Sequence, residues 1–511
     1  MKTLAELFAD IPEVRFFGGD PAACRPESLL TDSRRVVPGA LFFAMDGLRS
    51  RGSDFAPDAV ARGAVAVVAR ERLASLPPHV AQAVVPDVAE AVARVARRFF
   101  DDPASALTLV GVTGTNGKTS VASLTRFLMM RLTSAPWGLV GTVRYELGRR
   151  SMPSYKTTPE SLDLASLFAE MRDAGCVGAA MEVSSHAIDQ KRVFALPFSV
   201  VAFTNLTQDH MDYHGNMENY FAVKSRLFDG SQGAFPRAAV VNADDPWGRR
   251  LLASLPMRTR AVPFGLRRDA EETRGRADGF FADSVRLSPG GSEFELHCPA
   301  GVFPVKTRLP GDYNVSNVLC ALALVGALGG DVARAARDVA DFPGVPGRME
   351  RVPENPFPFE VFVDYAHTDD ALTNALGMLK KITSGRVLAV FGCGGNRDRG
   401  KRPKMVRAVQ ALADFAWATS DNPRKEPLER IFDDMKAGVT APEKILFEPD
   451  RRRAIALALD AAREGDCVLV AGKGHETYQE FADITLPFDD KAVARELLAL
   501  KKLRPAGTAR R

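Results

Sequence analysis

The sequence predicts an α/β protein with three domains, each built around a sheet of mainly parallel strands. Apolar runs of four to six residues, such as 179–183, 200–204 and 387–391, alternate with helical patterns. Runs of this kind are typical of parallel strands that helices cover on both faces. At about 150 residues per domain, a chain of 511 residues corresponds to three domains.

Two breaks divide the sequence into these domains. Asp101-Asp102-Pro103 follows a helical stretch and precedes the apolar run 107–112. The second break, residues 342–347, is rich in proline and glycine, which end helices, and follows a long Ala- and Leu-rich region. We therefore expect a small N-terminal α/β domain over 1–102, a central parallel-sheet domain over 103–342 and a C-terminal Rossmann-like α/β domain over 343–511.

The composition is that of an average soluble globular protein, with 25% charged and 46% hydrophobic residues. The 67 Lys and Arg residues exceed the 63 Asp and Glu residues by only 4, so no nucleic-acid partner is predicted. The longest apolar run, 318–328, is shorter than the roughly 20 residues of a membrane span, and residues 1–17 carry charges where a signal peptide is apolar. We expect a cytoplasmic protein without a membrane span.

The cysteines are far apart in the sequence, and no two of them form a C-x-x-C pair. Their neighbours are mostly apolar residues or glycine. This pattern predicts buried free thiols and argues against disulfides or a zinc site. The six residues are Cys24, Cys176, Cys298, Cys320, Cys393 and Cys467.

A phosphate-binding loop is predicted where an apolar run ends and a helical pattern begins. It comprises Thr113, Gly114, Thr115, Asn116, Gly117, Lys118 and Thr119. Backbone N–H groups and the helix N-terminus can bind phosphate oxygens, Lys118 can bridge the β- and γ-phosphates, and the Thr119 hydroxyl can bind Mg²⁺. Val112 stands where the usual motif has its first glycine. We expect a P-loop ATPase-like central domain; the alternative is a structural glycine turn.

A carboxylate and a histidine follow the next two predicted strands. If these strands are neighbours, Glu182 and His210 reach the sheet edge that carries the phosphate loop, where they could bind a second divalent ion. A hydrogen-bonded structural histidine is the alternative. His210 and His214 have the i, i+4 spacing of a zinc pair, but no H-E-x-x-H motif is present and Asp212-Tyr213 has the character of a turn. Spacing alone predicts that Lys224 is a solvated helix residue.

Seven motifs together resemble those of the Mur ligases of peptidoglycan synthesis, in particular the members that add the third residue of the stem peptide. They are TGTNGKT (113–119), MEVSSH (181–186), NLTQDHMDYH (205–214), GDYNVSN (311–317), PGRME (346–350), DYAH (364–367) and GKGHE (472–476). The resemblance runs from about residue 29 to residue 490. It implies an ATP-dependent amide ligation, in which a substrate carboxylate attacks the γ-phosphate and an amine then displaces phosphate from the acyl phosphate.

The resemblance also implies roles for individual residues. Lys224 matches a lysine that is carbamylated in the family, which turns an ammonium into an anionic metal ligand. The implied catalytic residues are Lys118, Glu182, His210 and carbamylated Lys224. The implied ligands of Mg²⁺ are Thr119, Glu182, His210 and Lys224. Beyond the phosphate loop, the residues implied to contact ATP are Asn314, Asn317, Arg348 and Asp364.

The implied acceptor is UDP-N-acetylmuramoyl-L-alanyl-D-glutamate, with its nucleotide end in the first domain. Ser33, in Thr31-Asp32-Ser33-Arg34, is the candidate for the UDP moiety, with a surface turn as the alternative. Hydroxyls and one guanidinium match positions that contact the muramoyl-dipeptide, whose oxygens they can bind. These residues are Thr157, Thr158, Ser184, Gln190 and Arg192.

The third domain is implied to select the amino acid. Asp421-Asn422-Pro423-Arg424 follows a predicted strand and resembles the sequence of family members that use meso-diaminopimelate. Arg424 and Asn422 can bind the second carboxylate of diaminopimelate, whereas lysine would leave Arg424 unpaired. Alone, Asn-Pro also favours a β-turn. The full implied set is Arg397, Asp421, Asn422, Pro423, Arg424, Gly472 and Glu476.

Several alternatives remain open. Within the ligases they are a lysine-adding enzyme, which the D-N-P-R segment disfavours, and folylpolyglutamate synthetase, which the N-terminal domain disfavours. A P-loop ATPase switch or a non-catalytic interaction protein belongs to other classes. We expect a monomer. The basic stretches 451–453 and 501–511 are interpreted as solvated faces, with an acidic partner as the alternative.

Overall fold

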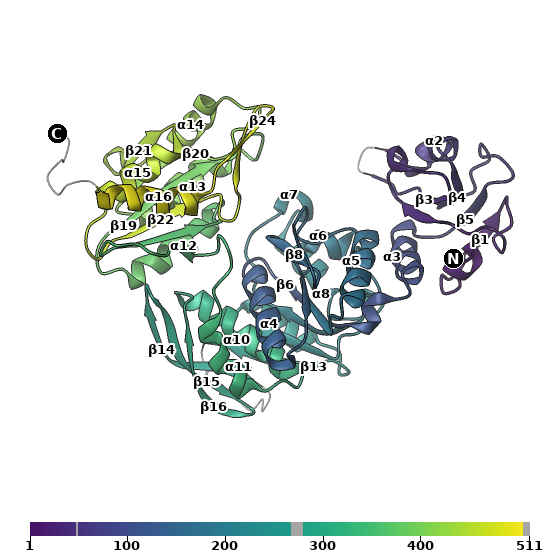
Figure 1. The fold of residues 1–511 in the computed structure, drawn as a ribbon, viewed down its shortest axis with the longest axis horizontal. Helices are drawn as coiled ribbons and strands as arrows, with labels where there is room; N and C mark the ends of the chain where they lie inside the picture. Colours follow the sequence, from purple (N-terminus) through teal and green to yellow (C-terminus); the bar gives the residue numbers. More distant parts are fainter. Residues whose placement is uncertain (48–49, 267–278, 504–511) are drawn as a thin grey trace. The chain divides into compact units, whose positions relative to one another are not determined.

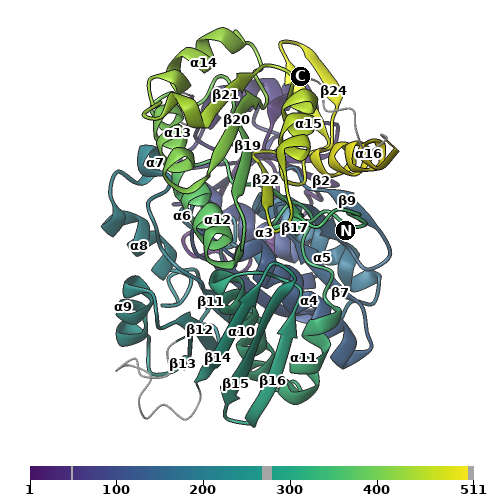
Figure 2. The ribbon, with the colours of Figure 1, turned by 90° about the vertical axis from the view of Figure 1, so that its left-hand side faces the viewer.

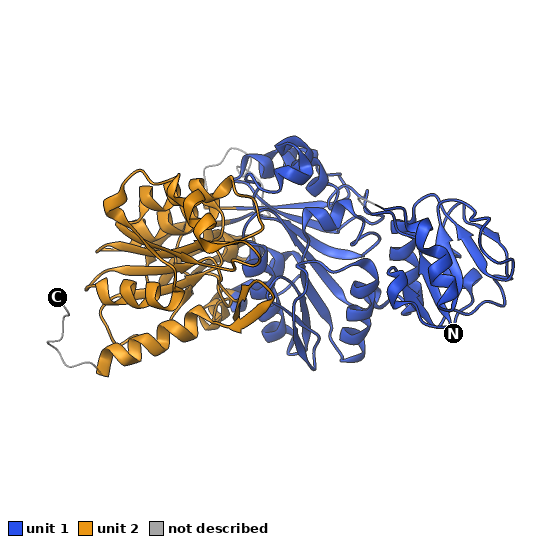
Figure 3. Cartoon of the chain, turned by 90° about the horizontal axis from the view of Figure 1, so that it is seen from above, with its two compact units in different colours: residues 1–264, 269–280, 320–335 blue, residues 265–268, 281–319, 336–511 orange. Residues whose placement is uncertain are grey.

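The computed structural model describes residues 1–47, 50–266 and 279–503. Among these, two compact units are distinguished (Figure 3): unit 1 contains residues 1–47, 50–264, 279–280 and 320–335, and unit 2 contains residues 265–266, 281–319 and 336–503. The predicted fold class is confirmed, because helices cover several sheets that contain parallel strands. The division into three domains stays a prediction.

The first sheet of unit 1 has five strands in the order β1-β5-β4-β3-β2, with only β1 antiparallel to its neighbour. Helix α3 begins after Asp87, whose side chain accepts a hydrogen bond from the Glu90 backbone N–H. It packs on this sheet through an apolar face that includes Val88, Val92 and Val95. The elements are α1 (Leu4–Leu7), β1 (Arg15–Phe17), β2 (Ser28–Leu30), η1 (Ser33–Arg35), β3 (Ala40–Phe43), η2 (Gly52–Phe55), α2 (Ala56–Ala61), β4 (Ala64–Ala69), β5 (Ala81–Val84), α3 (Val88–Phe99) and η3 (Pro103–Ala106).

The second sheet of unit 1 is centred on β6, which pairs in parallel with β10 on one side and with β11 on the other. Gly111 of β6 lets the ring of Phe198 lie against the strand, since a Cβ there would be 2.9 Å from Phe198 Cε1. The strands, in spatial order, are β13 (Arg260–Gly265), β12 (Ala238–Asn242), β11 (Phe198–Phe203), β6 (Thr108–Thr113), β10 (Gly178–Glu182), β7 (Trp137–Val140), β8 (Arg144–Glu146) and β9 (Ser151–Pro153). The β7–β8–β9 ribbon is antiparallel and was not predicted.

Helices connect the parallel strands of this sheet, as Figure 1 shows for α4, α5 and α6. They are α4 (Lys118–Thr133), α5 (Ser161–Asp173), α6 (Ser185–Asp189), α7 (Met211–His214), α8 (Met217–Ser225) and α9 (Pro246–Ser254). Two further helices, α10 (Asp312–Ala327) and α11 (Val332–Asp338), contribute residues to both units.

In unit 2, three antiparallel strands lie side by side in Figure 2: β14 (Phe280–Ser288, of which Phe280 belongs to unit 1), β15 (Gly291–Cys298) and β16 (Gly301–Thr307). They were not predicted, because their alternation of polar and apolar residues does not form the continuous apolar runs on which the sequence analysis relied. A short antiparallel hairpin of β23 (Tyr478–Phe481) and β24 (Ile484–Pro487) lies near the end of the chain.

The main sheet of unit 2 has six strands in the order β17-β18-β22-β19-β20-β21. Successive residues of β19 face opposite sides: Leu388 and Val390 join one apolar cluster, and Ala389 and Phe391 join the other. Both faces are therefore buried, as expected of a doubly wound sheet. The elements are η4 (Val339–Asp341), β17 (Glu350–Arg351), β18 (Glu360–Asp364), α12 (Asp369–Ile382), β19 (Val387–Cys393), α13 (Lys401–Leu412), β20 (Phe415–Ser420), α14 (Leu428–Lys436), η5 (Pro442–Lys444), β21 (Ile445–Glu448), α15 (Arg451–Ala461), β22 (Cys467–Ala471) and α16 (Asp490–Leu503).

Two sequence predictions are corrected by burial. Cys24 and Cys298 are half-buried, while the other four cysteines are buried free thiols as expected. Arg451 is not part of a solvated face. Its side chain is fully buried, whereas Arg452 and Arg453 are exposed enough to fit the prediction. Residues 504–511 of the predicted basic face lie outside the described residues.

No helix in the described parts of the chain is both long enough and apolar enough to span a membrane.

Arg451 links the ends of two strands. Its Nε and Nη2 donate to the carboxylate of Asp490, each at 2.7 Å, and its side chain also donates to the carbonyls of Ser420 at the end of β20 and Ala471 at the end of β22. Neither side chain of the Arg451–Asp490 pair is exposed. Each of these two buried charges therefore has a partner of opposite charge, and an unpaired charge at such a site would be costly.

Replacing Arg451 with methionine is expected to lower the free energy of unfolding by about 3–5 kcal/mol, because it leaves the buried Asp490 carboxylate without its partner. Urea denaturation followed by circular dichroism measures this. Arg452→Met is the matched control: Arg452 joins the same two helices through an exposed pair with Glu496, so its loss is expected to cost less than about 1 kcal/mol. Equal losses in the two variants would contradict the assignment.

Candidate active site

The predicted phosphate loop joins β6 to α4 in unit 1 and has the expected strand, loop and helix context. Gly114 (φ 143°) and Gly117 (φ 87°) adopt positive φ angles, and a Cβ on Gly114 would lie 1.9 Å from Thr204 Oγ1. Any residue with a Cβ at position 114 would therefore have a strained backbone and would also clash with Thr204. Lys118 Nζ folds back over the loop and donates to the carbonyls of Gly114 (3.0 Å) and Thr115 (2.8 Å).

Glu182 lies directly beside the first turn of α4. Its Oε2 accepts a hydrogen bond from the Thr119 hydroxyl at 3.0 Å, and its Oε1 accepts one from the Thr142 backbone N–H at 2.7 Å. The structure thus brings two predicted metal ligands, Thr119 and Glu182, into contact. Thr142 was missed by the sequence analysis, because it belongs to a segment without a motif.

The strands that lead to Glu182 and His210 are not neighbours, contrary to prediction. The phosphate-loop strand β6 lies between β10 and β11, as is usual when the first strand of a doubly wound sheet is central. Glu182 is the last residue of β10 and His210 follows the carboxyl end of β11, so both still lie beyond the two strands that flank β6.

Lys224 is not a solvated helix residue, as its spacing alone predicted. It is 1% exposed on α8, and its Nζ donates to the Gly114 carbonyl at 2.9 Å and lies 4.7 Å from the centre of the Tyr220 ring. Burial, and then the charge of Lys118, hold the pKa of Lys224 well below its usual value. The Lys224 amine and Lys118 donate to the same carbonyl oxygen.

His210 stands in a cluster of rings at the start of α7. It adopts a positive φ of 53°, and its ring lies 4.8 Å from that of His186 and 6.4 Å from that of Tyr220. Burial lowers the pKa of His186 to about 4, so this ring is neutral at pH 7. Neither His186 nor Tyr220 was predicted as a site residue, because lone aromatic positions carry no spacing signal.

His214, which has the spacing of a zinc pair with His210, contacts another side chain through one ring nitrogen. His214 Nε2 is hydrogen-bonded to Ser185 Oγ at 2.9 Å, and Asp212-Tyr213 belongs to helix α7, not to a turn. Among the described residues, no group of three His, Cys, Asp or Glu side chains could hold a metal ion. Thr119 and Glu182 offer the hard oxygen donors that Mg²⁺ prefers, whereas the ammonium form of Lys224 would repel it. The residues therefore fit Mg²⁺ better once Lys224 loses its positive charge.

The residues predicted for the muramoyl-dipeptide form one hydrogen-bonded group in unit 1. Thr158 Oγ1 donates to the Glu182 carbonyl at 2.8 Å and accepts from the Ser184 backbone N–H at 3.1 Å. Arg192 donates to the Thr158 carbonyl at 3.1 Å and to Gln190 Oε1 at 2.5 Å. The remaining member, Thr157, shares a 3.0 Å hydrogen bond with Thr142.

Ser33 is the first residue of the short helix η1 and is 8% exposed. The preceding Asp32 caps η1 by accepting from the Arg34 backbone N–H, and it forms an ion pair with Arg34. Ser33 is therefore a buried residue in a capped single turn of 3-10 helix, and its contact with the UDP moiety stays a prediction.

The predicted ATP contacts outside the phosphate loop lie in unit 2. Asn314 and Asn317 are buried on α10, where Asn317 Nδ2 donates to Asn314 Oδ1 at 3.2 Å. At the end of β18, the Asp364 carboxylate accepts the backbone N–H groups of Met349 (2.6 Å) and Ala366 (2.8 Å). The guanidinium of Arg348 lies over the Tyr365 ring at 4.9 Å, and burial raises the pKa of Asp364.

The residues predicted to select the amino acid meet at the carboxyl ends of β20 and β22. Asn422 Nδ2 donates to Glu476 Oε2 at 2.9 Å, and the buried ammonium of Lys473 donates to both Asn422 Oδ1 (2.9 Å) and Glu476 Oε2 (3.0 Å). Gly472 (φ 116°) lies so close to Asp421 that a Cβ would be 2.6 Å from its Oδ2. Lys473 was quoted in a motif but not predicted as a site residue.

Arg424 carries its own counter-ion. It adopts a positive φ of 55°, its Nε lies 2.8 Å from Glu480 Oε2, and its Nη1 donates to the Gly395 carbonyl at 3.0 Å. The expectation that Arg424 is unpaired without a second substrate carboxylate is therefore wrong. Arg397 is exposed in the loop after β19; Pro423, which follows Asn422, is buried.

The buried side chain of Arg402 supports the loop that carries Arg424. Arg402, on α13, donates to Glu426 Oε2 at 2.7 Å and to Asp434 Oδ2 at 2.8 Å, and Glu426 Oε2 also accepts the Asn396 backbone N–H at 2.8 Å. The hydrogen bonds from Arg402 lower the pKa of Glu426 to about 2. Glu426 thus connects the loop after β20 to the loop after β19.

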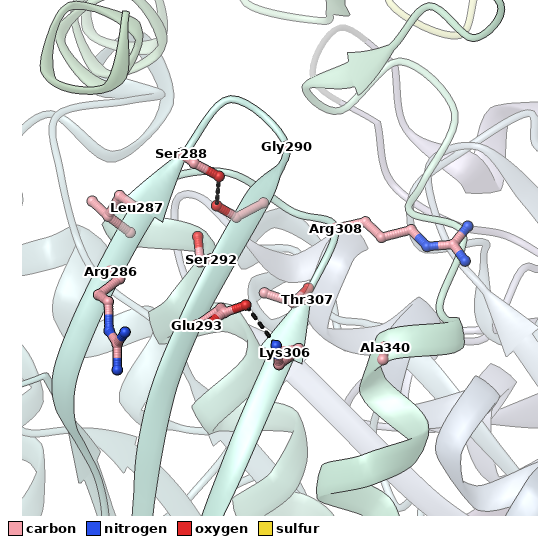
Figure 4. Close-up of a pocket in the computed structure, with 11 residues that line it drawn as sticks. Arg286, Leu287, Ser288, Gly290, Ser292, Glu293, Lys306, Thr307, Arg308 and Ala340 are labelled. Atoms are coloured by element: carbon pink, nitrogen blue, oxygen red, sulfur yellow. Dashed lines mark hydrogen bonds and ion pairs between the residues drawn. The ribbon is translucent and has the colours of Figure 1, made fainter.

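A hollow of about 360 Å³ in unit 2 contains none of the predicted site residues (Figure 4). It is lined by the β14–β15 turn and by residues of β16 and η4. Its polar groups are largely satisfied within the sheet: Lys306 pairs with Glu293 at 2.9 Å, and the Ser288 hydroxyl donates to the Gly291 carbonyl at 3.1 Å.

Three family models match successive parts of the chain: "Mur ligase family, catalytic domain" over residues 27–106, "Mur ligase middle domain" over 112–325 and "Mur ligase, glutamate ligase domain" over 347–474. A curated protein of Solibacter usitatus, named UDP-N-acetylmuramoyl-L-alanyl-D-glutamate--2,6-diaminopimelate ligase, is 44% identical over 97% of this chain and 98% of its own length. The chain belongs to the Mur ligase family. The resemblance found in the seven motifs is thereby confirmed, and the chain is a ligase.

Solved structures agree with this assignment. One titled UDP-N-acetylmuramoyl-L-alanyl-D-glutamate--2,6-diaminopimelate ligase is 32% identical, with a TM-score of 0.70 over 98% of this chain and all of its own. The folylpolyglutamate synthase of Mycobacterium tuberculosis shares the fold, with a TM-score of 0.59 at 18% identity over 80% of this chain and 95% of its own.

Glu426→Gln is expected to destabilise the protein at pH 7, because it removes the carboxylate that is paired with Arg402. Since the pKa of Glu426 is lowered by folding, its stabilising effect is full above the ordinary glutamate pKa of 4.5 and is lost as the pH falls toward 2. The difference in melting temperature between parent and variant should therefore shrink over this window. A difference that stays constant from pH 7 to pH 3 would contradict the role given to this pair.

Proposed function

We propose that the protein is an ATP-dependent amide ligase that joins meso-diaminopimelate to UDP-N-acetylmuramoyl-L-alanyl-D-glutamate in peptidoglycan biosynthesis. The observation that carries this proposal is the Asp421–Arg424 loop at the end of β20. It stands in a chain that matches, over nearly its whole length, a relative that is named for this reaction. An arginine at this place suits an amino acid that bears a second carboxylate.

The phosphate loop is proposed to bind ATP. Backbone N–H groups at the start of α4 and the Lys118 ammonium would bind the phosphates. Asn314 or Asn317 would approach the adenine, and Arg348 and Asp364 would contact the phosphates or the ribose. When bound, Mg²⁺ would neutralise charge on the transferring phosphoryl group, held by Thr119, Glu182, His210 and modified Lys224. Lys118 would lose its hydrogen bonds to the loop carbonyls in favour of the phosphates.

Carbamylation of Lys224 is supported by its surroundings. Only a neutral amine attacks carbon dioxide, and the lowered pKa of Lys224 favours that form. The new N–C bond forms as the amine nitrogen attacks the carbon of CO₂, one proton leaves to solvent, and the product is a carbamate anion. Two carbamate oxygens, which share one negative charge, would then lie near the place where the Lys224 amine shares the Gly114 carbonyl with Lys118.

The acceptor is proposed to lie along the hydrogen-bonded group of Thr157, Thr158, Ser184, Gln190 and Arg192, with its nucleotide near Ser33. One carboxylate of its terminal glutamate attacks the γ-phosphorus, ADP leaves, and an amine of diaminopimelate attacks the acyl carbon with release of phosphate. Side chains that hold the two substrates in line supply much of the rate. The residues proposed to hold the amino acid are Arg397, Asp421, Asn422, Pro423, Arg424, Gly472 and Glu476.

The place of the reaction and the assembly state are also proposals. ATP and nucleotide-linked precursors are made in the cytoplasm, so we place the enzyme there. That it acts as a monomer stays a prediction, which size-exclusion chromatography with light scattering tests.

Phosphate release is expected only when ATP, the UDP-linked acceptor and meso-diaminopimelate are all present. A coupled phosphate assay with meso-diaminopimelate, lysine and ornithine offered separately measures this. Lys118→Ala should abolish the release, because the charge that binds the β- and γ-phosphates is lost. Equal turnover without an amino acid would favour a P-loop ATPase switch, and preference for lysine would favour a lysine-adding ligase.

A carbamate on Lys224 is expected to give a carbonyl resonance in the ¹³C NMR spectrum when ¹³C-bicarbonate is added to the protein. The resonance should vanish in Lys224→Arg, because a guanidinium does not form a carbamate under these conditions. Lys191→Arg is the control, since Lys191 is half-buried and paired with Asp87 and Glu90, and this variant should keep the resonance. A parent protein without the resonance at saturating bicarbonate would refute the modification.

A further inference from the structure

The guanidinium of Arg424 is already engaged by a carboxylate of the protein itself. Glu480 Oε2 lies 2.8 Å from Arg424 Nε, and the two side chains are 35% and 28% exposed. Glu480 is on strand β23, whereas Arg424 lies in the loop after β20, and no motif in the sequence pointed to Glu480. A carboxylate at this position competes for the group that is proposed to bind the second carboxylate of the substrate.

The backbone keeps Glu480 beside Arg424. The Arg424 N–H donates to the Glu480 carbonyl at 3.0 Å, and the Ala482 N–H donates to the Arg424 carbonyl at 2.6 Å, which makes a parallel bridge between the two segments. The Glu480 N–H also donates to Asn422 Oδ1 at 3.1 Å. Rotation of the Glu480 side chain can therefore break the ion pair without moving the main chain of the site.

The hydrogen bonds that Arg424 already donates determine how a substrate carboxylate can bind to it. Its Nη1 donates to the Gly395 carbonyl, so Nε and Nη1 are both engaged by the protein. A substrate carboxylate must share the guanidinium with Glu480 or displace it. Because both side chains are partly solvated, the pair is weak enough to be displaced.

We propose that Glu480 is a specificity-determining residue of the amino-acid site, which lowers the affinity for a substrate with a second carboxylate and reduces discrimination against lysine. This rests on the proposed function. With Glu480 in place, Arg424 stays paired when lysine is bound, so lysine loses little affinity. Without the Glu480 carboxylate, bound lysine would leave Arg424 with no anionic partner, while the second carboxylate of diaminopimelate would pair with a guanidinium for which no other carboxylate competes.

The test is the isosteric variant Glu480→Gln, assayed by phosphate release with meso-diaminopimelate and with lysine at saturating ATP and acceptor. We expect the KM for meso-diaminopimelate to fall by about two- to fivefold, the range of a partly exposed ion pair, with little change in kcat. The ratio of kcat/KM for diaminopimelate to that for lysine should rise by at least the same factor. The KM for ATP should not change.

Asp483→Asn is the matched control. It removes a carboxylate from the same hairpin, where Asp483 is 85% exposed and pairs only loosely with Lys425 at 3.4 Å, and it should leave all these constants unchanged. A rise in the KM for diaminopimelate in Glu480→Gln would overturn the proposal, because Glu480 would then orient Arg424 or bind the substrate ammonium. An equal fall in the KM for diaminopimelate in both variants would also overturn it, since the effect would then come from the loss of any negative charge on the hairpin. A parent protein that releases no phosphate with diaminopimelate would refute the proposed function itself.

Discussion

Two lysine side chains that share the carbonyl oxygen of Gly114 form the interaction on which the site in unit 1 depends. Two ammonium groups so close together repel each other, and Lys224 is also fully removed from water. The protein relieves this by holding the pKa of Lys224 low. The buried position on α8 and the nearby charge of Lys118 both contribute to making this amine neutral and reactive.

The position of β6 explains why the remaining groups gather at the same place. A strand with parallel neighbours on both sides brings three strand ends to one edge of the sheet. The loop after β6 then lies between the segment that carries Glu182 and the segment that leads to His210. The contact between Thr119 and Glu182 follows from this order.

The fold class and the phosphate loop could be predicted because their signals are local: apolar runs, glycines and a helical pattern follow one another in the sequence. Lys224 could not be recognised as buried from its spacing, since its burial depends on Thr113 and Gly114, far away in the chain. Arg451 was misread for the same reason, because its partner Asp490 lies on another helix. Glu480 carried no signal at all, as only the bridge between β23 and the Arg424 loop brings it to the site.

The buried Arg451–Asp490 pair gives the last described helix, α16, a part in the amino-acid site. Asp490 is the first residue of α16, and its partner binds the two carbonyls from which the Asp421 and Gly472 loops depart. A protein truncated ahead of α16 would keep every residue proposed to touch the amino acid, yet it would lose the carboxylate that neutralises the guanidinium beneath them. The helix is thus better regarded as the foundation of those loops than as a terminal extension of the domain.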